Sequence, residues 1–301
     1  KYWLEDIAKI PCNVEVASEY RYRHPVILDG TLFVTISQSG ETADTLQALK
    51  TAKERNKKIN TLCICNTAES SITRNSDLTF LTHAGPEIGV ASTKAFTTQL
   101  VALALLTCSI GVSKRTINKQ QEKLIIEGLK QLPGLINETL LQENQIKNLA
   151  VRFKGKNSAL FLGRGTMHAI ANEGALKLKE ISYIHAESYP AGELKHGPIA
   201  LIDESIPVIA IAPNDELLSK LKSNLQEVNS RGSQMIVFED KNSKIKPMKF
   251  MEVIPITSNL GRITAPIIFT IPLQLLSYHV ALLKGTNVDK PRNLAKSVTV
   301  E

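Results

Sequence analysis

A short polar segment, residues 37–42, carries the residue types that bind an anion. It reads Ser-Gln-Ser-Gly-Glu-Thr and joins an apolar run, residues 33–36, to a helical pattern. The first amides of a helix are unpaired and partly positive, and the hydroxyls and the Gln amide add further donors. Gly40 lets the backbone approach a ligand closely. An ordinary helix N-cap needs only one hydroxyl, so the full set favours a phosphate site.

The Gly-Lys-Ser/Thr signature of nucleotide-hydrolysing phosphate loops does not follow this segment. Nucleotide hydrolysis is therefore disfavoured, and a simpler phosphate ester is the expected ligand.

The loop must be positioned by a strand and a helix, and such elements alternate along the chain. Apolar runs rich in β-branched residues predict strands at residues 13–17, 31–36, 60–65, 78–81, 159–162, 183–186, 207–211, 234–238 and 253–256. Helical patterns fall at residues 42–55, 91–109, 167–180 and 215–231. Because several strands are apolar on both faces, the pattern indicates parallel sheets covered by helices, with right-handed crossovers.

The two halves of the chain resemble each other. In each half a strand, a polar loop and a helix lead to a second strand, which indicates a tandem duplication with a helical connector at residues 118–153. The second half opens with a strand at 159–162 and the loop Gly163-Arg164-Gly165-Thr166. The first half has no counterpart of this pair, so we expect the chain to begin inside a domain.

Composition excludes several classes of protein. Aromatic residues make up only 5%, and the basic residues behind the net charge of +7 are scattered, which argues against a nucleic-acid partner. The four cysteines lack metal-ligand spacing, so we expect reduced core thiols, no metal and a cytoplasmic location. The longest apolar run, residues 101–112, is too short to span a bilayer and predicts a buried helix rather than a membrane segment.

Four segments, taken together, resemble one enzyme family. The loop at residues 37–42 resembles the phosphate loop of sugar isomerase (SIS) domains. Three others are similar to the isomerase half of the glutamine–fructose-6-phosphate aminotransferase family: residues 87–94 (EIGVASTK), residues 173–180 (EGALKLKE) running on to 193–198 (ELKHGP), and the tail at 291–301 (PRNLAKSVTVE).

The resemblance implies an α/β fold of two tandem SIS lobes, each a flavodoxin-like parallel sheet flanked by helices on both faces. It implies conversion of fructose 6-phosphate and ammonia to glucosamine 6-phosphate without a cofactor. The ammonia would come from glutamine, through a glutaminase domain of the same full-length chain. Residue 1 is Lys and the nearest cysteine is Cys12, so nothing here matches that domain. We therefore expect this chain alone to isomerise fructose 6-phosphate to glucose 6-phosphate.

The resemblance also implies which residues form the binding site. The phosphate would be bound by Ser37, Gln38, Ser39 and Thr42. The sugar would be contacted by Val90, Ser92, Glu87 and Ala295, although Val90 is equally compatible with a core position.

Four residues are implied to be catalytic. Glu180 would move a proton between C1 and C2 of the open-chain sugar. Lys177, one helical turn earlier, would stabilise enediolate-like charge or form a simple ion pair with Glu180. His196 would open the sugar ring from the neighbouring subunit, a task that suits its pKa. Lys296 would form a Schiff base with C2 of the ketose.

A site that uses residues of two subunits requires a homodimer. The pattern at residues 263–283 is apolar nearly all round, which suits a helix buried between lobes or subunits. We divide the chain into a first SIS lobe (1–117), the connector (118–153), a second SIS lobe (154–285) and a tail (286–301) that folds over the site when substrate binds.

Two other functions remain open at this stage. A non-catalytic sugar-phosphate-binding SIS regulator would need the phosphate loop but not Glu180, His196 or Lys296. A related SIS deglycase is the third possibility.

Overall fold

The protein is described by a computed structural model that covers residues 1–299 and divides into two compact units. The first unit contains Trp3–Lys119 together with the tail from Asn293 onward, and the second contains Gln120–Arg292. Each unit holds one sheet in which all strands run parallel.

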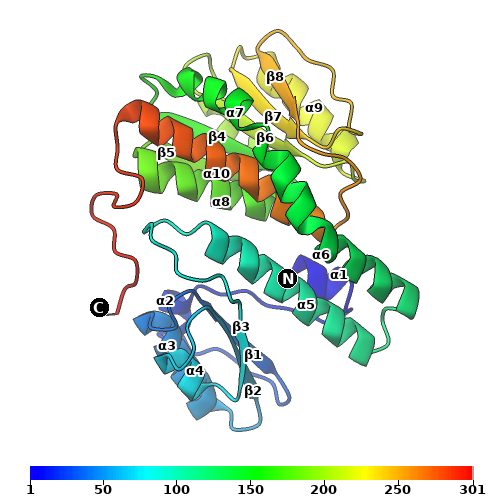
Figure 1. Cartoon of the computed structure of the whole chain (residues 1–301), viewed down its shortest axis with the longest axis vertical. Helices are drawn as coiled ribbons and strands as arrows, with labels where there is room; N and C mark the ends of the chain where they lie inside the picture. Colours follow the sequence, from blue (N-terminus) through cyan, green and yellow to red (C-terminus); the bar gives the residue numbers. More distant parts are fainter. Residues whose placement is uncertain (300–301) are drawn as a thin grey trace. The chain divides into compact units, whose positions relative to one another are not determined.

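The first unit is built on a three-stranded sheet in the order β1-β2-β3. Its strands are β1 (Leu32–Ser37), β2 (Asn60–Cys65) and β3 (Leu78–Leu81). Its helices are α1 (Tyr2–Asp6), α2 (Ala17–Tyr20), α3 (Ala43–Arg55), α4 (Ser71–Asn75) and α5 (Lys94–Ser113). Cys63 and Cys65 of β2 pack against Leu49 of α3 and Ile72 of α4. Helix α5 contacts β2 from the other side, so the sheet is covered on both faces (Figure 1).

The second unit is built on a five-stranded sheet in the order β5-β4-β6-β7-β8. Its strands are β4 (Ser158–Gly163), β5 (His185–Pro190), β6 (Val208–Ala212), β7 (Met235–Glu239) and β8 (Met251–Pro255). This is the strand order 2-1-3-4-5 of flavodoxin-like folds, which places ligand sites beyond the carboxyl ends of the strands. Its helices are α6 (Lys119–Leu140), α7 (Glu143–Leu149), η1 (Ala150–Phe153), α8 (Thr166–Ser182), η2 (Ala191–His196), η3 (Pro198–Leu201), α9 (Leu218–Asn229) and α10 (Thr264–Lys284).

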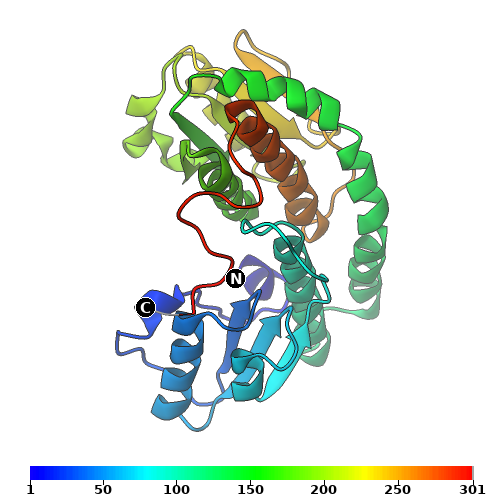
Figure 2. The same cartoon turned by 60° about the vertical axis from the view of Figure 1, so that its left-hand side comes forward.

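Alternate residues of the second sheet face two different helix layers. Leu160 and Leu162 pack with Leu221 and Leu225 of α9. Phe161 points to the other face, which α8 and α10 cover side by side (Figures 1 and 2). Burial on both faces explains why these strands read as continuous apolar runs.

The α/β class, the parallel sheets and the repeated unit predicted from sequence are confirmed. The series β1, α3, β2 and β3 repeats as β6, α9, β7 and β8, in the same spatial order. The connector is helical as predicted, and its elements α7 and η1 pack on α10 within the second unit. The division of the chain into four parts at residues 117, 153 and 285 stays our proposal.

Two strand predictions were wrong. Residues 13–16 form no regular structure and Ala17 begins α2. The corresponding strand of the second unit, β5, pairs only with β4, and among residues 1–299 the first unit has no counterpart of β4 to pair with. The strand predicted at 183–186 instead begins at His185, because Tyr183 adopts a left-handed conformation (φ 61°) that ends α8.

Two helices, α5 and α10, are long and apolar enough to cross a membrane by length and composition. The core helix of a soluble protein meets the same criteria, and 67% of the apolar window of α10 is buried, against 33% for α5. The buried helix predicted at residues 101–112 is part of α5. Ala102, Ala104 and Cys108 are buried as expected, whereas Leu105 and Val112 are exposed.

Candidate functional site

The predicted phosphate loop lies between β1 and α3, as expected, and forms a tight turn. Ser37 is the last residue of β1, and its Oγ accepts a hydrogen bond of 3.0 Å from the amide of Gly40. The same Oγ lies 3.1 Å from Oγ1 of Thr42, the N-cap residue of α3. Ser39 Oγ accepts from the amide of Glu41 at 3.2 Å. One hydroxyl of the Ser37–Thr42 pair donates to the other, so the proton of the second hydroxyl and that of Ser39 remain available to an anion.

Helix α4 supports this loop from behind. The amide of Ile72 donates to the carbonyl of Gly40 at 3.0 Å, and the amide of Ser71 donates to Glu41 Oε1 at 2.8 Å. Hydrogen bonding to Ser71 lowers the pKa of Glu41. The sequence analysis gave Glu41 no role. A carboxylate inside a loop expected to bind an anion was a signal that it stabilises the conformation of the loop.

The C-terminal tail brings Lys296 into the first unit. Its Nζ donates to Glu87 Oε2 at 2.6 Å and to the carbonyl of Gly89 at 2.8 Å. Two residues later, the carbonyl of Val298 accepts from the amide of Ala43, the first residue of α3, at 3.1 Å. Lys296, the segment 87–92 and the phosphate loop therefore lie in one unit and share hydrogen bonds through the tail.

The carboxylate of Glu87 is surrounded by hydrogen-bond donors. Its side chain is 4% exposed, and its Oε1 accepts from the amides of Thr93 and Ala95 at 2.8 and 3.1 Å, at the start of α5. Burial by itself would raise the pKa of Glu87, but the hydrogen bonds from Lys296 and from these amides lower it below its ordinary value. Glu87 is therefore a carboxylate held in its ionised form.

The other predicted sugar contacts belong to the same two segments. Val90 and Ser92 are half-buried in the segment that leads to α5, and Ala295 is exposed beside Lys296. Their contact with a sugar stays a prediction.

The predicted proton-transfer residues lie in the second unit, on α8. Lys177 has a side chain that is 4% exposed, donates to Glu180, and lies 3.6 Å from Glu173 Oε1. The simple ion pair considered from sequence is thus present, but the lysine is buried between two carboxylates. Sequence reasoning missed Glu173, although its i,i+4 spacing to Lys177 places both on one helix face.

His196 is the last residue of η2, in the same unit as Glu180, and it is exposed. Gly197 follows with φ 139°, a conformation that side chains with a Cβ rarely adopt, and it fixes the turn after the histidine.

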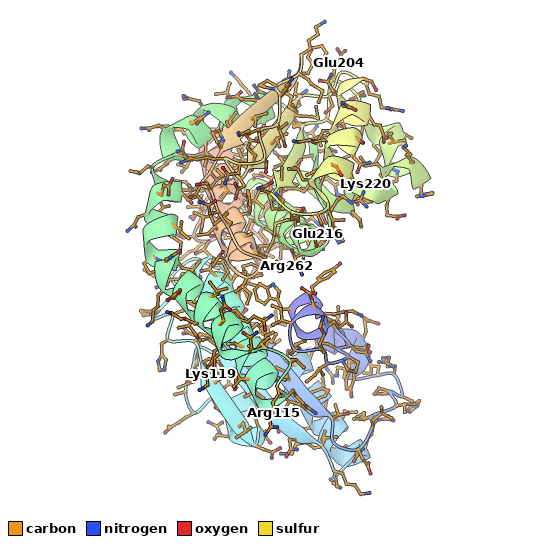
Figure 3. All side chains as sticks on the ribbon, turned by 90° about the vertical axis from the view of Figure 1, so that its right-hand side faces the viewer. Arg115, Lys119, Glu204, Glu216, Lys220 and Arg262 are labelled. Atoms are coloured by element: carbon orange, nitrogen blue, oxygen red, sulfur yellow. The ribbon has the colours of Figure 1, made fainter. Side chains whose placement is uncertain are left out.

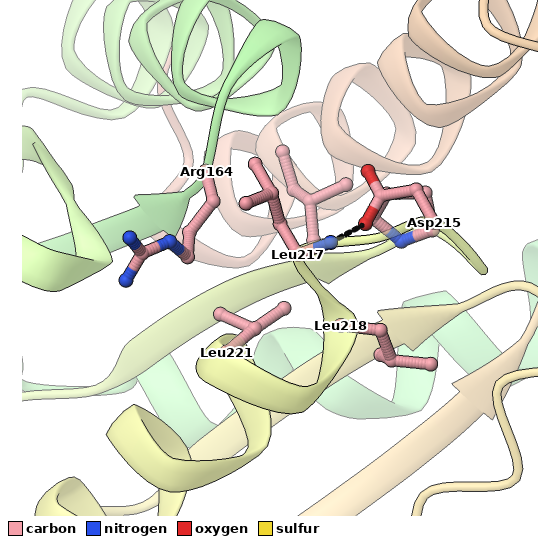
Figure 4. A pocket seen from close by; sticks show the side chains of 7 residues that line it. Arg164, Asp215, Leu217, Leu218 and Leu221 are labelled. Atoms are coloured by element: carbon pink, nitrogen blue, oxygen red, sulfur yellow. Dashed lines mark hydrogen bonds between the residues drawn. The ribbon is translucent and has the colours of Figure 1, made fainter.

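The second unit also contains the duplicated counterpart of the phosphate loop, between β6 and α9. Here Asp215 Oδ1 accepts from the amide of Leu217 at 2.9 Å, and burial raises the pKa of this aspartate (Figure 4). The surrounding recess is lined by Leu217, Leu218 and Leu221, and Arg164 points away from Asp215. Because a half-buried carboxylate lies in this loop where hydroxyls precede α3, the second loop is less suited to a phosphate.

Next to Asp215, Glu216 forms an exposed ion pair with Arg262 at 3.5 Å (Figure 3). Such an exposed pair contributes little to stability. Among residues 1–299, no group of three or more His, Cys, Asp and Glu side chains is arranged to hold a metal ion.

The predicted site residues therefore divide between the units. The phosphate loop, Glu87 and Lys296 are in the first unit, and Lys177, Glu180 and His196 are in the second. Within each unit the structure brings its members together: the tail with the loop, and Lys177 with Glu180.

The fold and the phosphate loop define the class of protein. The family model of the SIS domain matches residues 1–109 and 152–284, and the chain belongs to this family. The chain is 60% identical over its whole length to the glutamine–fructose-6-phosphate aminotransferase (isomerizing) of Pseudomonas syringae, and 56% identical to that of Francisella tularensis. It spans about half the length of these relatives, 49% in both cases.

Solved structures agree with this assignment. The C-terminal domain of the Francisella tularensis glucosamine–fructose-6-phosphate aminotransferase matches 96% of this chain, which covers 81% of that domain, with 53% identity and a TM-score of 0.94. A glucosamine-6-phosphate deaminase from Thermotoga maritima matches 99% of this chain with a TM-score of 0.77. The chain covers 84% of it at 24% identity, so this likeness shows the shared fold alone.

Proposed function

We propose that this chain is the isomerase part of an enzyme that converts fructose 6-phosphate and ammonia to glucosamine 6-phosphate. The observation that carries the proposal is the meeting of Lys296 and the phosphate loop in one unit, through the contacts of the tail with Glu87 and Ala43. A primary amine in the same unit as a candidate phosphate loop suits a phosphorylated ketose, because amines add to carbonyl carbons.

In the mechanism we propose, Ser37, Gln38, Ser39 and Thr42 hold the phosphate with their hydroxyl and amide donors. His196 opens the sugar ring, and Lys296 adds to C2 and releases water to form an imine. Ammonia then replaces the lysine at C2. Glu180 moves the proton between C1 and C2, and the buried charge of Lys177 stabilises the negative charge that develops in this step.

The partners we propose follow from the same chemistry. Fructose 6-phosphate is the substrate, glucosamine 6-phosphate is the product, and a glutaminase domain of the same full-length chain supplies the ammonia. No nucleic acid and no membrane take part. We place the protein in the cytoplasm, which its four free cysteines support.

We also propose a homodimer in which His196 reaches the site of the partner subunit. The exposure of His196 at the end of η2 supports this arrangement, since an exposed side chain is available to a second chain.

The test is to incubate the protein with fructose 6-phosphate, reduce with borohydride and locate the adduct by mass spectrometry. We expect a sugar phosphate on Lys296 and, without reductant, formation of glucose 6-phosphate. A Lys296→Met variant should lose the adduct, whereas the exposed Lys290→Met should keep it. Replacing Glu180 by Gln should slow isomerisation by about 100-fold or more, the usual contribution of a positioned acid–base group.

The absence of both adduct and glucose 6-phosphate would refute the enzymatic function. Phosphate-ester binding without either product would favour the regulator.

A further inference from the structure

The carboxylate of Glu87 has both oxygens committed to groups of its own chain. Oε1 accepts from the amides of Thr93 and Ala95, and Oε2 accepts from Lys296. With only 4% of the side chain exposed, little of the carboxylate can be reached by a sugar hydroxyl. The residue therefore has a geometry that suits a support for Lys296 better than a sugar contact.

The burial of this pair distinguishes it from a surface ion pair. The side chain of Glu87 is 4% exposed and that of Lys296 is 29% exposed, so solvent screens their attraction only partly. The amides at the start of α5 fix the carboxylate from the other side, which prevents it from following a mobile lysine. Its position therefore does not depend on Lys296 alone.

We propose that Glu87 is the fixed counter-ion of Lys296, holding its nitrogen in place both as an ammonium and as a protonated imine. This role rests on the proposed function, in which Lys296 reacts with the ketose. Glu87 acts through Lys296 and does not touch the reacting carbon, so it is a positioning residue.

The charge balance of imine formation fits a counter-ion that never changes its own charge. The ammonium of Lys296 first loses a proton, because only the free amine can add to the C2 carbonyl. The C–N double bond then forms, the C–O double bond breaks, and the two protons lost from nitrogen leave with the carbonyl oxygen as water. One positive charge is on the nitrogen before and after. The carboxylate of Glu87 neutralises that charge in both states, and the amides of Thr93 and Ala95 keep it ionised.

The number of N–H groups on the Lys296 nitrogen is also consistent with the counter-ion role of Glu87. The ammonium has three donors, and it uses one on Glu87 and one on the carbonyl of Gly89, at 2.8 Å. The protonated imine has a single N–H. The charge-assisted bond to Glu87 is the stronger of the two, so the imine keeps it and gives up the bond to Gly89.

The experiment compares adduct formation in three variants of the protein, using cyanoborohydride, which reduces protonated imines selectively. Glu87→Gln keeps an oxygen for the α5 amides but presents an amide NH₂ to Lys296. Glu87→Asp keeps the charge. Asp29→Asn is the matched control, because it removes an exposed carboxylate that pairs with Lys58 in the same unit. Binding of inorganic phosphate and thermal melting verify that each variant is folded.

We expect Glu87→Gln to form the Lys296 adduct about 10- to 100-fold more slowly, the range for losing one charge-assisted hydrogen bond. The adduct yield of each protein should fall as the pH is raised from about 6 to 9. In Glu87→Gln this fall should occur at lower pH than in the unmodified protein, because the imine loses its proton more easily. Glu87→Asp should restore part of the rate, and Asp29→Asn should match the unmodified protein.

Two outcomes separate this inference from the proposed function. If the unmodified protein forms no adduct on Lys296, the imine of the proposed function fails. If it forms the adduct and Glu87→Gln does so at the same rate and with the same pH dependence, the counter-ion role is overturned while the function stands. If Glu87→Gln does not fold, Glu87→Asp decides, because its carboxylate is one methylene further from Lys296: a rate below that of Asp29→Asn supports the role, and a rate and pH dependence equal to those of the unmodified protein overturn it.

Discussion

At the scale of single residues, the candidate loop depends on Gly40, whose lack of a side chain lets its backbone lie close to neighbouring atoms. Gly40 has φ 69°, and a Cβ added there would lie 1.9 Å from Ser70 Oγ and 2.8 Å from Cys65 Sγ. These neighbours are buried, so they cannot move aside easily. The same close approach lets the carbonyl of Gly40 accept from the amide of Ile72.

We therefore predict that Gly40→Ala weakens phosphate binding by at least about tenfold and lowers the free energy of unfolding by roughly 2–4 kcal/mol, from strain and overpacking together. Titration with fructose 6-phosphate and denaturant unfolding measure the two effects. Gly30→Ala is the control: its φ of 76° imposes similar strain, but nothing lies within 4 Å of the added Cβ. If both variants behave alike, the contact with Ser70 does not matter.

At the scale of elements, the second unit depends on the close packing of α8 and α10 against its sheet. Gly174 of α8 faces Leu273 of α10 and Phe161 of β4, and a Cβ at this position would lie 2.7 Å from Leu273 Cδ1 and 2.9 Å from Phe161 Cε1. Both neighbours are fully buried. The position of α8 in turn sets that of Lys177 and Glu180, so this packing bears directly on the predicted proton transfer.

Gly174→Ala should therefore destabilise the second unit, by about 1–3 kcal/mol, although Gly→Ala within a helix normally stabilises. Thermal unfolding followed by circular dichroism measures the change. Gly134→Ala in α6, where nothing lies within 4 Å of the added Cβ, should instead stabilise by up to about 1 kcal/mol. Equal, stabilising effects of the two substitutions would contradict the packing argument.

At the scale of the whole molecule, the proposed dimer determines whether His196 and Lys296 of different chains share a site. The apolar helix α10 does not by itself require a second chain, because it packs on α8, α7 and η1 of its own unit. The case for the dimer rests on the exposed His196.

We predict a mass of twice 33.1 kDa in solution by light scattering. His196→Ala and Lys296→Met should each be inactive alone. After subunit exchange in an equal mixture, about a quarter of the isomerase activity should return, because half of the dimers then contain one intact site of two. A mixture that stays inactive despite exchange would place both residues in the site of a single chain.

Local patterns were sufficient to predict much of this protein. The turn at residues 37–42, β2 at residues 60–65 and the helical connector follow from turn chemistry and hydrophobic period, which depend on residues close together in the chain. The SIS assignment follows from short segments in order along the chain. The wrong strand at 13–17 had a suitable local pattern, but a strand also needs a neighbour to pair with, and that requirement is not local.

Only the tertiary structure decided which groups meet. Lys296 and Glu87 are separated by 209 residues and nevertheless form a hydrogen bond, which no spacing in the sequence indicates. The structure likewise showed that Glu173 is buried against Lys177, and that Asp215 accepts from the amide of Leu217 in the loop before α9, where the first unit has hydroxyls. The physical reason is the same in each case. Propensity and periodicity act over a few residues, whereas the partner of a charged group is set by how distant segments pack.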